Sequence, residues 1–317
     1  MRPRCIPISL TFTLMAALAH GASLDLAGTW RFRLDPQDRG LAQQWWTGAL
    51  PGTVKLPGVL TAQGYGDPVS MQTQWTGNLR EEWFTDPYYQ QYQGPDDFKM
   101  PFWLQPERHY VGAAWYQRDI TIPDDWQGKR IILLLERPHW ETAVWLDDQR
   151  VGLCDSLGTA HVHVLGYDLA PGQHRLTLRV DNRMIIDVGP NSHSVSDHTQ
   201  GNWNGIAGRV ELQATDCIWI EDVQVYPRIA DHAIWVNVDL SSLAARPEQM
   251  HLQAQVSSRD GKETHASMTL PISNPAKQSR ISFLYHLDES CRAWDEFTPV
   301  LYDLELALRA DTPLQQR

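Results

Sequence analysis

The feature that most constrains this chain is a series of short apolar and alternating segments between Tyr110 and Asn182. Ile131–Leu135 are five consecutive apolar residues, which is too few for a helix and typical of a strand buried on both faces. Leu176, Leu178 and Val180 alternate with polar residues, so they share one face of another strand. We therefore expect a β-sheet core in this region.

Turn residues separate these segments. The strand Ala143–Leu146 ends at the turn pair Asp147-Asp148, after which the chain returns through Arg150 and Val151. Pro123 ends an upstream strand in which apolar residues again alternate. No segment here has the apolar period of a helix, so the pattern predicts an antiparallel β-sandwich as the first folded domain.

A second series of strands begins near Asp216. At 317 residues the chain is long enough for two ordinary domains. Short strand-like segments recur up to LYDLELALR, Leu301–Arg309, at intervals typical of an immunoglobulin-like sandwich. We count six of them against roughly seven expected. The prediction is a domain over 23–216, and a second domain over 217–317 that lacks its last strand.

The first residues have the pattern of a secretory signal peptide. Arg2 and Arg4 precede a mostly apolar run, Ile6–Leu18, and small residues suited to cleavage follow it. The run is too short for a permanent membrane-spanning helix. We expect a signal peptide over 1–22, no membrane anchor, and a secreted or periplasmic protein.

The net charge narrows the classes of binding partner, and the cysteine content bears on disulfide bonding. Removing Arg2 and Arg4 takes the formal charge from −11 to −13, and an acidic surface repels nucleic acid. Beyond the signal, Cys154, Cys217 and Cys291 are odd in number and widely spaced, which is not a disulfide framework. One disulfide among the three remains open, and no cofactor is expected.

Two loops interrupt the first predicted domain. The segment from Thr61 to Val111 lacks periodicity and is rich in aromatic residues, which favours packing of the loop on its own domain over contact with sugar rings. The segment from Met184 to Gly208 is polar and contains one large aromatic residue, Trp203. Polar loops on a rigid sandwich are where ligand contacts usually lie.

No local motif predicts catalysis or a metal site. A nucleophile elbow, a phosphate loop and HExxH are all absent. His161 and His163 are two apart on a predicted strand, but without a third ligand they indicate ordinary hydrogen-bonded histidines. His193 and His198, in the polar loop, are better placed for ligand contact. We predict no catalytic residue and no metal.

Several segments resemble glycoside hydrolase family 2, the β-galactosidase and β-glucuronidase group. They are LAGTWRFRLDP, AAWYQRDITIPDDWQGKRIILLLERPHWETAVWLDD, LTLRVDN, GNWNGIAGRVEL and WDEFTPVLYDLELAL. The resemblance implies an all-β chain. It would be a jelly-roll-like (galactose-binding-like) β-sandwich with a sugar-binding role, followed by an incomplete immunoglobulin-like sandwich. In the family a catalytic TIM barrel comes next, with two glutamates in a retaining mechanism.

The resemblance also implies where a carbohydrate would bind. The family's acid/base motif contains an Asn-Glu pair, which is absent from this sequence, so we expect the barrel to be missing and the chain alone to be inactive. The family's sugar-contacting loop carries an aspartate ahead of a motif matched by Asn202-Trp203-Asn204-Gly205-Ile206. The predicted substrate-binding residues are Asp197, His198, Asn202, Trp203 and Asn204. We expect Asp197 or His198, together with Asn202, on one exposed rim of the first sandwich.

Three functions follow as hypotheses. The first is the non-catalytic N-terminal part of a secreted glycosidase that hydrolyses terminal β-glycosides. The second is a stand-alone carbohydrate-binding module. The third is a structural or interaction protein without sugar binding, because loop composition alone does not assign a site.

Overall fold

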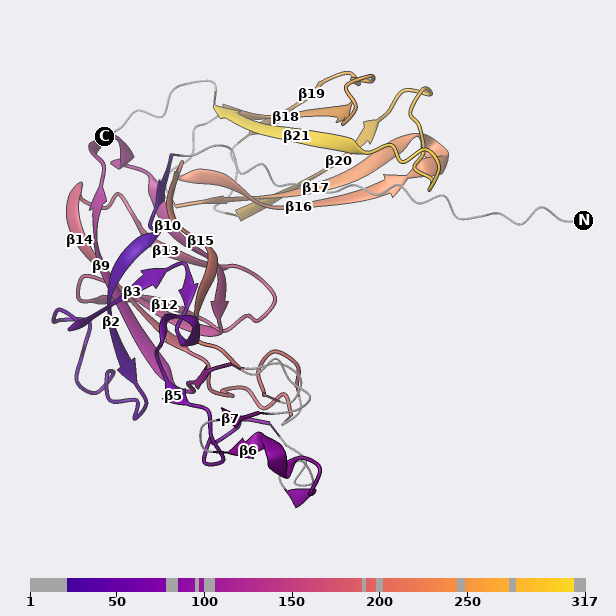
Figure 1. The fold of residues 1–317 in the computed structure, drawn as a ribbon. Helices are drawn as coiled ribbons and strands as arrows, with labels where there is room; N and C mark the ends of the chain where they lie inside the picture. The colour runs from indigo at the N-terminus through magenta and orange to yellow at the C-terminus, as the bar shows by residue number, and fades with distance from the viewer. Residues whose placement is uncertain are drawn as a thin grey trace, which may run out of the picture. The chain divides into compact units, whose positions relative to one another are not determined.

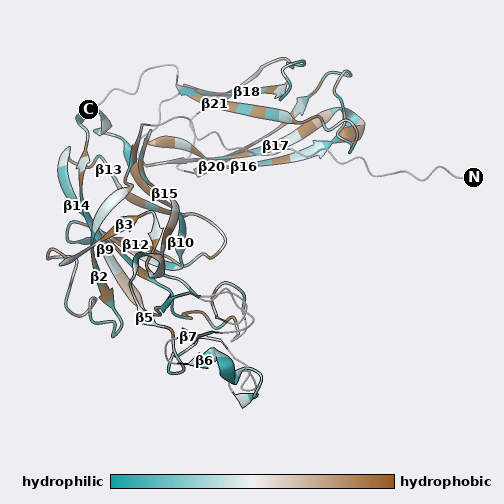
Figure 2. Cartoon of the chain, viewed as in Figure 1, coloured by the Kyte–Doolittle hydropathy of each residue, from teal (hydrophilic) through white to brown (hydrophobic). Residues whose placement is uncertain are grey.

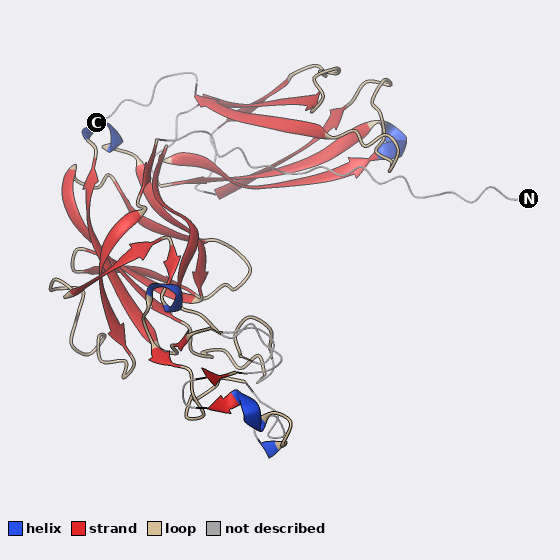
Figure 3. Ribbon diagram, in the orientation of Figure 1, coloured by secondary structure: helices blue, strands red, loops and turns tan. Residues whose placement is uncertain are grey.

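The computed structural model describes residues 22–77, 85–94, 97–99, 106–189, 192–197, 202–243, 249–273 and 278–310. This part of the chain forms two compact units, Ala22–Ala214 and Thr215–Arg317, which we call the first and second sandwich. Both are built from antiparallel strands (Figures 1 and 3). The predicted signal peptide lies outside the described residues, apart from Ala22.

One layer of the first sandwich is a six-stranded sheet in the order β12-β11-β14-β9-β2-β3. Its strands are β2 (Gly28–Asp35), β3 (Gly52–Leu56), β9 (Ala113–Ile122), β11 (Glu141–Leu146), β12 (Gln149–Cys154) and β14 (Gly172–Asp181). The predicted hairpin is confirmed, since β11 pairs with β12 around Asp147, whose φ of 52° is left-handed.

The second layer is a five-stranded sheet in the order β1-β15-β10-β13, with β4 also paired to β15. Its strands are β1 (Ser23–Asp25), β4 (Gly58–Val59), β10 (Arg130–His139), β13 (His161–Tyr167) and β15 (Gly205–Thr215). The five apolar residues Ile131–Leu135 form the middle of β10 and are all buried, as their pattern predicted.

The core between the two layers follows the alternation of the strands. Leu176, Leu178 and Val180 of β14 face Ile131, Leu133 and Leu135 of β10 in one apolar cluster that also holds Trp30 and Tyr116. On the outer side of the six-stranded sheet, Trp46 stacks on Trp145, with ring centroids 5.0 Å apart. The first sandwich thus covers part of its outer surface with its own aromatic residues.

Short elements occupy the described parts of the first long loop, between Thr61 and Val111. They are η1 (Thr61–Gln63), β5 (Asp67–Pro68), η2 (Gln90–Tyr92), β6 (Gln93–Gly94), β7 (Asp97–Phe98) and β8 (Arg108–His109), with η3 (Asp124–Trp126) further on. Phe98 and Tyr110 are buried, whereas Tyr88 is exposed. The aromatic loop therefore packs at some positions and is open at others.

The second sandwich has two three-stranded sheets, β16-β17-β20 and β19-β18-β21. The strands are β16 (Ile218–Arg228), β17 (Ala233–Ser242), β18 (Gln249–Ser258), β19 (Met268–Ser273), β20 (Gln278–His286) and β21 (Tyr302–Ala310), with η4 (Ile229–Asp231) between β16 and β17. Hydrophobic and hydrophilic residues alternate along the strands (Figure 2). The inward residues form one aliphatic core that includes Val236, Val238, Leu252 and Val256.

Tyr302, the first residue of β21, fixes one end of the second sandwich. Its hydroxyl accepts a hydrogen bond from the amide of Arg292 at 2.8 Å, ten residues upstream, and donates to Glu263. A tyrosine that bonds back to the preceding backbone at this corner is typical of immunoglobulin-like folds.

The predicted all-β class is confirmed: a jelly-roll-like β-sandwich precedes an immunoglobulin-like one. The missing last strand of the second stays a prediction. The second sandwich has six strands among the described residues, and β21 pairs there only with β18. Within the same residues the strands are antiparallel and the helices are short 3-10 turns, so this part of the chain holds no catalytic barrel.

Candidate functional site

The two long loops of the first sandwich meet at Asp197. The amide of Thr76 donates to Asp197 Oδ2 at 2.9 Å, and the Thr76 hydroxyl donates to the same oxygen at 2.7 Å. In return, the Asp197 amide donates to Thr76 Oγ1 at 3.1 Å. Residues that are 121 positions apart in sequence are thereby joined by three hydrogen bonds.

Asp197 is fully buried and its carboxylate is fully engaged. His109 Nε2 lies 3.1 Å from Oδ2, and the amide of Asn202 donates to Oδ1 at 2.7 Å. Burial alone would raise the pKa of Asp197, but the bonds from His109, Thr76 and Asn202 outweigh it and hold that pKa below its usual range. Asp197 is thus an ionised anchor for both loops.

Three asparagines continue this network into the sandwich. The side-chain amide of Asn202 donates to the carbonyl of Asn182 at 2.8 Å, and Asn182 Nδ2 donates to the carbonyl of Tyr110 at 2.8 Å. Asn204 Nδ2 donates to the carbonyls of Gly112 and Val180. Because all three asparagines are buried, each hydrogen bond satisfies a group that would otherwise be left without a partner.

The backbone geometry at position 205 requires the glycine that follows Asn204. Its φ is 146°, and a Cβ at this position would lie 2.3 Å from the carbonyl oxygen of Gly58 on the paired strand β4. No larger residue fits where the two backbones approach so closely. The Asn-x-Asn-Gly-Ile pattern therefore has a structural origin at each polar position.

Two tryptophans at this site are partly exposed. Trp203 stacks on His139, with ring centroids 4.7 Å apart, and Trp75 meets His109 edge-on at 5.0 Å. His139 contacts the carbonyl of Trp203 through Nδ1 at 2.7 Å and that of Ser194 through Nε2. Burial lowers the pKa of His139, and this effect outweighs both carbonyls. The indoles of Trp75 and Trp203 are the partly exposed aromatic surfaces described at this site. His193 and Ser194 of the polar loop are exposed near Trp203 in sequence.

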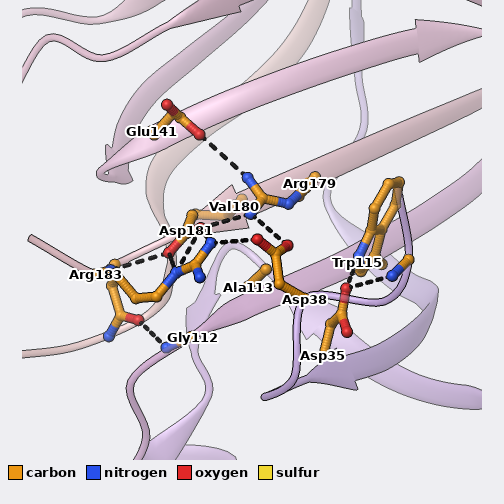
Figure 4. Close-up of polar contacts among 12 residues, drawn as sticks. Asp35, Asp38, Gly112, Ala113, Trp115, Glu141, Arg179, Val180, Asp181 and Arg183 are labelled. Atoms are coloured by element: carbon orange, nitrogen blue, oxygen red, sulfur yellow. Dashed lines mark hydrogen bonds and ion pairs between the residues drawn. The ribbon is translucent and has the colours of Figure 1, made fainter. Parts of the chain in front are cut away.

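A charged cluster fixes the start of the polar loop, at the end of β14 (Figure 4). Asp181, which is fully buried, accepts hydrogen bonds from the guanidinium groups of Arg179 and Arg183. Arg179 also bonds Asp38 at 2.8 Å and Glu141 at 3.1 Å. Burial raises the pKa of Glu141, whereas Arg183 and Arg179 hold the pKa of Asp38 below its usual range despite burial. Arg179 and Asp181 are buried, whereas Asp38 and Arg183 are partly exposed, so the cluster ties the end of β14 to the surface and acts as a support.

The predicted substrate-binding residues are brought together but not exposed as expected. Asp197, Asn202 and Asn204 are buried because their polar groups bond the backbone and the other loop. The exposed rim was therefore wrong for Asp197 and Asn202. Trp203 is partly exposed, and His198 lies outside the described residues. Their part in sugar binding stays a prediction, with Trp203 the residue best placed for contact.

Sequence reasoning missed Thr76 and His109. Neither lies in a motif, and each reaches Asp197 only through folding, across 121 and 88 residues. The aromatic density around Trp75 was the only local signal, and it indicated packing rather than a site.

The histidine pair of β13 is a buried structural pair. Thr142 Oγ1 lies 2.7 Å from His161 Nδ1 and 2.9 Å from His163 Nε2. Burial lowers the pKa of both histidines, and that of His163 falls to about 4. Across the described ranges, no group of three metal-ligating side chains occurs.

The cysteines and the helices add two findings. Cys154, Cys217 and Cys291 form no disulfide with one another, so the disulfide that the sequence left open does not form. Among the helices of the described chain, none has the length and apolar character needed to cross a membrane.

The carboxylate of the site is occupied in holding the two loops together. This carboxylate, Asp197, is held by four hydrogen bonds, and no second carboxylate faces it within the described loops. Glycoside hydrolysis requires two carboxyl groups flanking the bond. Two partly exposed indoles over a rigid polar base suit a sugar ring better than a reacting group.

Comparisons with known proteins agree with the family resemblance of the sequence. Residues 218–317 match the model of Glycosyl hydrolases family 2. A β-glucuronidase of Paenibacillus borealis is 20% identical over 304 residues, covering 90% of this chain and 42% of the relative. The chain therefore spans less than half the length of this curated relative.

Solved structures share the fold. A putative β-galactosidase from Bacteroides fragilis matches with a TM-score of 0.62 and 18% identity, over 91% of this chain and 39% of that one. A β-glucuronidase from an uncultured Clostridium matches with a TM-score of 0.59 and 18% identity, over 95% and 44%. The β-glucuronidase 2 of Bacteroides uniformis, covalently bound to cyclophellitol-6-carboxylate aziridine, matches with 0.62 and 18%, over 91% and 30%.

Proposed function

We propose that this protein is the non-catalytic N-terminal part of a glycoside hydrolase of family 2. The family model that matches residues 218–317 supports this proposal. The complete enzyme would hydrolyse terminal β-glycosides by a retaining mechanism, with both catalytic carboxylates supplied by a barrel. The relatives named β-glucuronidase make a β-glucuronide the first substrate to test.

One observation carries the proposal for this chain: Asp197 locks the two loops of the first sandwich together. A loop that must present Trp203 at the mouth of a barrel has to be rigid, because loosely held contacts bind poorly. The buried bonds of Asp197 and Asn202 supply that rigidity. Trp203 and Trp75 would then contact the sugar, and Asp197 would position them.

The same two indoles support the second hypothesis, a chain that binds carbohydrate by itself. Partial exposure of Trp75 and Trp203 is compatible with sugar stacking without a barrel. In both hypotheses Trp75 and Trp203 contact the sugar, either directly in this chain or next to a catalytic barrel. Measuring sugar binding by these two residues therefore tests both hypotheses.

The compartment is also a proposal. A basic start and an apolar run before small residues support secretion or export to the periplasm. N-terminal sequencing of the exported protein would test it, with cleavage near Ala22 expected and an intact Met1 contradicting it.

The decisive experiment combines an activity assay with ligand-observed NMR on the 317-residue chain. We expect no release of nitrophenol from β-glucuronide, β-galactoside or β-mannoside chromogens, because the Asn-Glu motif is absent from the sequence. Saturation-transfer difference signals should appear for methyl β-glucuronide or methyl β-galactoside. They should disappear in Trp203→Ala.

Phe297→Ala serves as the matched control, because Phe297 is a highly exposed aromatic residue of the second sandwich. It should leave the sugar signals unchanged. Hydrolysis above a heat-killed sample would overturn the non-catalytic assignment, and signals that persist in Trp203→Ala would overturn the site.

A further inference from the structure

Strands β16, β17 and β20 form one sheet of the second sandwich (Figure 1). Its outer face carries an ordered set of side chains that the proposed function does not use. Along β17, Val236 and Val238 point into the core and are buried, so Trp235, Asn237 and Asp239 share the opposite face. Strand pairing extends each of these three residues into a row across the sheet. The rows are aromatic, polar and charged in turn.

The aromatic row consists of Tyr226, Trp235 and Leu284, which are directly paired across the three strands. Tyr226 is 51% exposed and Trp235 is 39% exposed. Paired residues on one face of a sheet have Cβ atoms about 5 Å apart. The two rings therefore lie side by side on an open, flat surface.

The polar row consists of Gln224, Asn237 and Ser282, paired in the same way. The indole N–H of Trp235 donates to Asn237 Oδ1 at 3.0 Å, and the hydroxyl of Ser282 donates to the same oxygen at 2.8 Å. The Tyr226 hydroxyl donates to Gln224 Oε1 at 3.2 Å. Each ring is thus tied along its own strand to the polar row, which restricts its rotation before any ligand arrives.

The charged row determines the net charge of this sheet face. Arg280 forms a two-pronged ion pair with Asp239, at 2.7 and 2.6 Å, which neutralises both. Asp222 completes the row and accepts a hydrogen bond from Gln224 at 3.0 Å. The net charge of the row is negative, so an anionic ligand would be repelled.

We propose that this face of the second sandwich binds a neutral polysaccharide chain, with Tyr226 and Trp235 stacking on sugar rings and the polar row bonding their hydroxyls. Fixed aromatic rings beside amide and hydroxyl groups match a ligand that alternates C–H faces with hydroxyls. The polar and charged rows interrupt the apolar part of this face, which is unlike the apolar centre of a protein interface. The negative row excludes nucleic acid and polyuronates.

This inference goes beyond the proposed function, because polymer binding requires no catalytic step and no residue of the first sandwich. It would hold the protein on a glycan whose ends a glycosidase could process. Failure of the glycosidase proposal therefore leaves it standing, and the reverse is also true.

The test is native gel electrophoresis of the 317-residue chain in gels that contain hydroxyethyl cellulose, galactomannan or polygalacturonate. We expect retarded migration in at least one neutral gel and none in the polygalacturonate gel. Trp235→Ala and Tyr226→Ala should each remove most of the retardation, at least tenfold in apparent affinity. Trp235→Phe, which keeps a ring, should retain part of it.

Phe297→Ala is the matched control, because it removes an exposed ring of the same sandwich and should migrate like the parent protein. Unretarded migration in both neutral gels overturns the proposal, as does equal retardation of the parent and Trp235→Ala. Self-association that Trp235→Ala abolishes, without retardation by either neutral polymer, would assign the face to a second copy of the chain instead. Circular dichroism checks that each variant is folded.

Discussion

The two sandwiches differ in whether aromatic side chains on an outer sheet face are covered. In the first, Trp46 covers Trp145 on the outer face of the six-stranded sheet, with ring planes 13° apart. In the second, Trp235 and Tyr226 lie on an outer sheet face with no covering segment among the described residues. The loop between β2 and β3 supplies the cover in the first case.

A second contrast concerns charge. The first sandwich buries Arg179 and Asp181 in a shared cluster, whereas the ion pair of Arg280 and Asp239 in the second is exposed. Buried polar networks are stabilising only when every member is paired. The first sandwich is therefore the more sensitive to single changes, and the second leaves its surface free for contacts.

The largest expected difference between the sandwiches comes from removing one arginine in each. Arg179→Met leaves Asp181 and Glu141 with fewer partners in the interior and should destabilise the first sandwich by about 4 kcal/mol. Arg280→Met removes an exposed pair and should cost under about 1 kcal/mol. Calorimetric unfolding of both variants measures this, and equal losses would contradict the contrast.

The next largest effect compares two paired leucines within the second sandwich. Leu252 of β18 is fully buried, while its partner Leu308 on β21 is only partly buried. Leu252→Ala should cost about 3 kcal/mol, and Leu308→Ala about 1 kcal/mol, because part of its surface is already in water. Urea unfolding gives both values. Similar costs would mean that the β21 edge is better covered than the described residues indicate.

Acid should affect the first sandwich through His163. Its pKa is about 4 in the folded protein because of burial, against roughly 6.5 when unfolded. The unfolded chain therefore takes up the proton first as the pH falls below 6.5, and stability is lost progressively down to about pH 4. At pH 5 the loss should be about 2 kcal/mol relative to pH 7.

His163→Gln should reduce this slope in urea unfolding measured between pH 7 and 5. His174 provides the opposite sign, because its contact with Asp147 raises its pKa despite partial burial. Its contribution is present below pH 6.5 and disappears at higher pH. An unchanged slope in His163→Gln would show that other groups control the acid response.

The smallest contrast is between the two outer tryptophans. Trp46→Ala uncovers Trp145 and should destabilise the first sandwich by about 1.5 kcal/mol. Trp235→Ala removes a side chain that is already exposed to solvent, so it should change the free energy of unfolding by less than about 0.5 kcal/mol. Thermal unfolding distinguishes them, and a large loss in Trp235→Ala would mean that this ring is structural.

Strand identity could be predicted because strand periodicity is local. Ile131–Leu135, the hairpin at Asp147 and the alternation around Leu178 all formed as expected. The six strand-like segments counted in the second sandwich also formed among the described residues. Each of these conclusions depends on residues within about ten positions of one another.

The candidate site was predictable only in part. The Asn-Trp-Asn-Gly-Ile motif located it, but Asp197 was expected at a surface and is buried. Its partners Thr76 and His109 come from another loop, and no local pattern relates them. Burial of a carboxylate depends on which donors the fold brings to it, and that information is not local.

The sequence by itself determined the strands, the order of the two sandwiches and the family resemblance, because side-chain alternation and turn chemistry act over a few residues. The tertiary structure alone decided which tryptophans are covered, where Asp197 lies and which rows cross the sheet β16-β17-β20. These outcomes depend on pairing register and on loops that meet across more than a hundred residues.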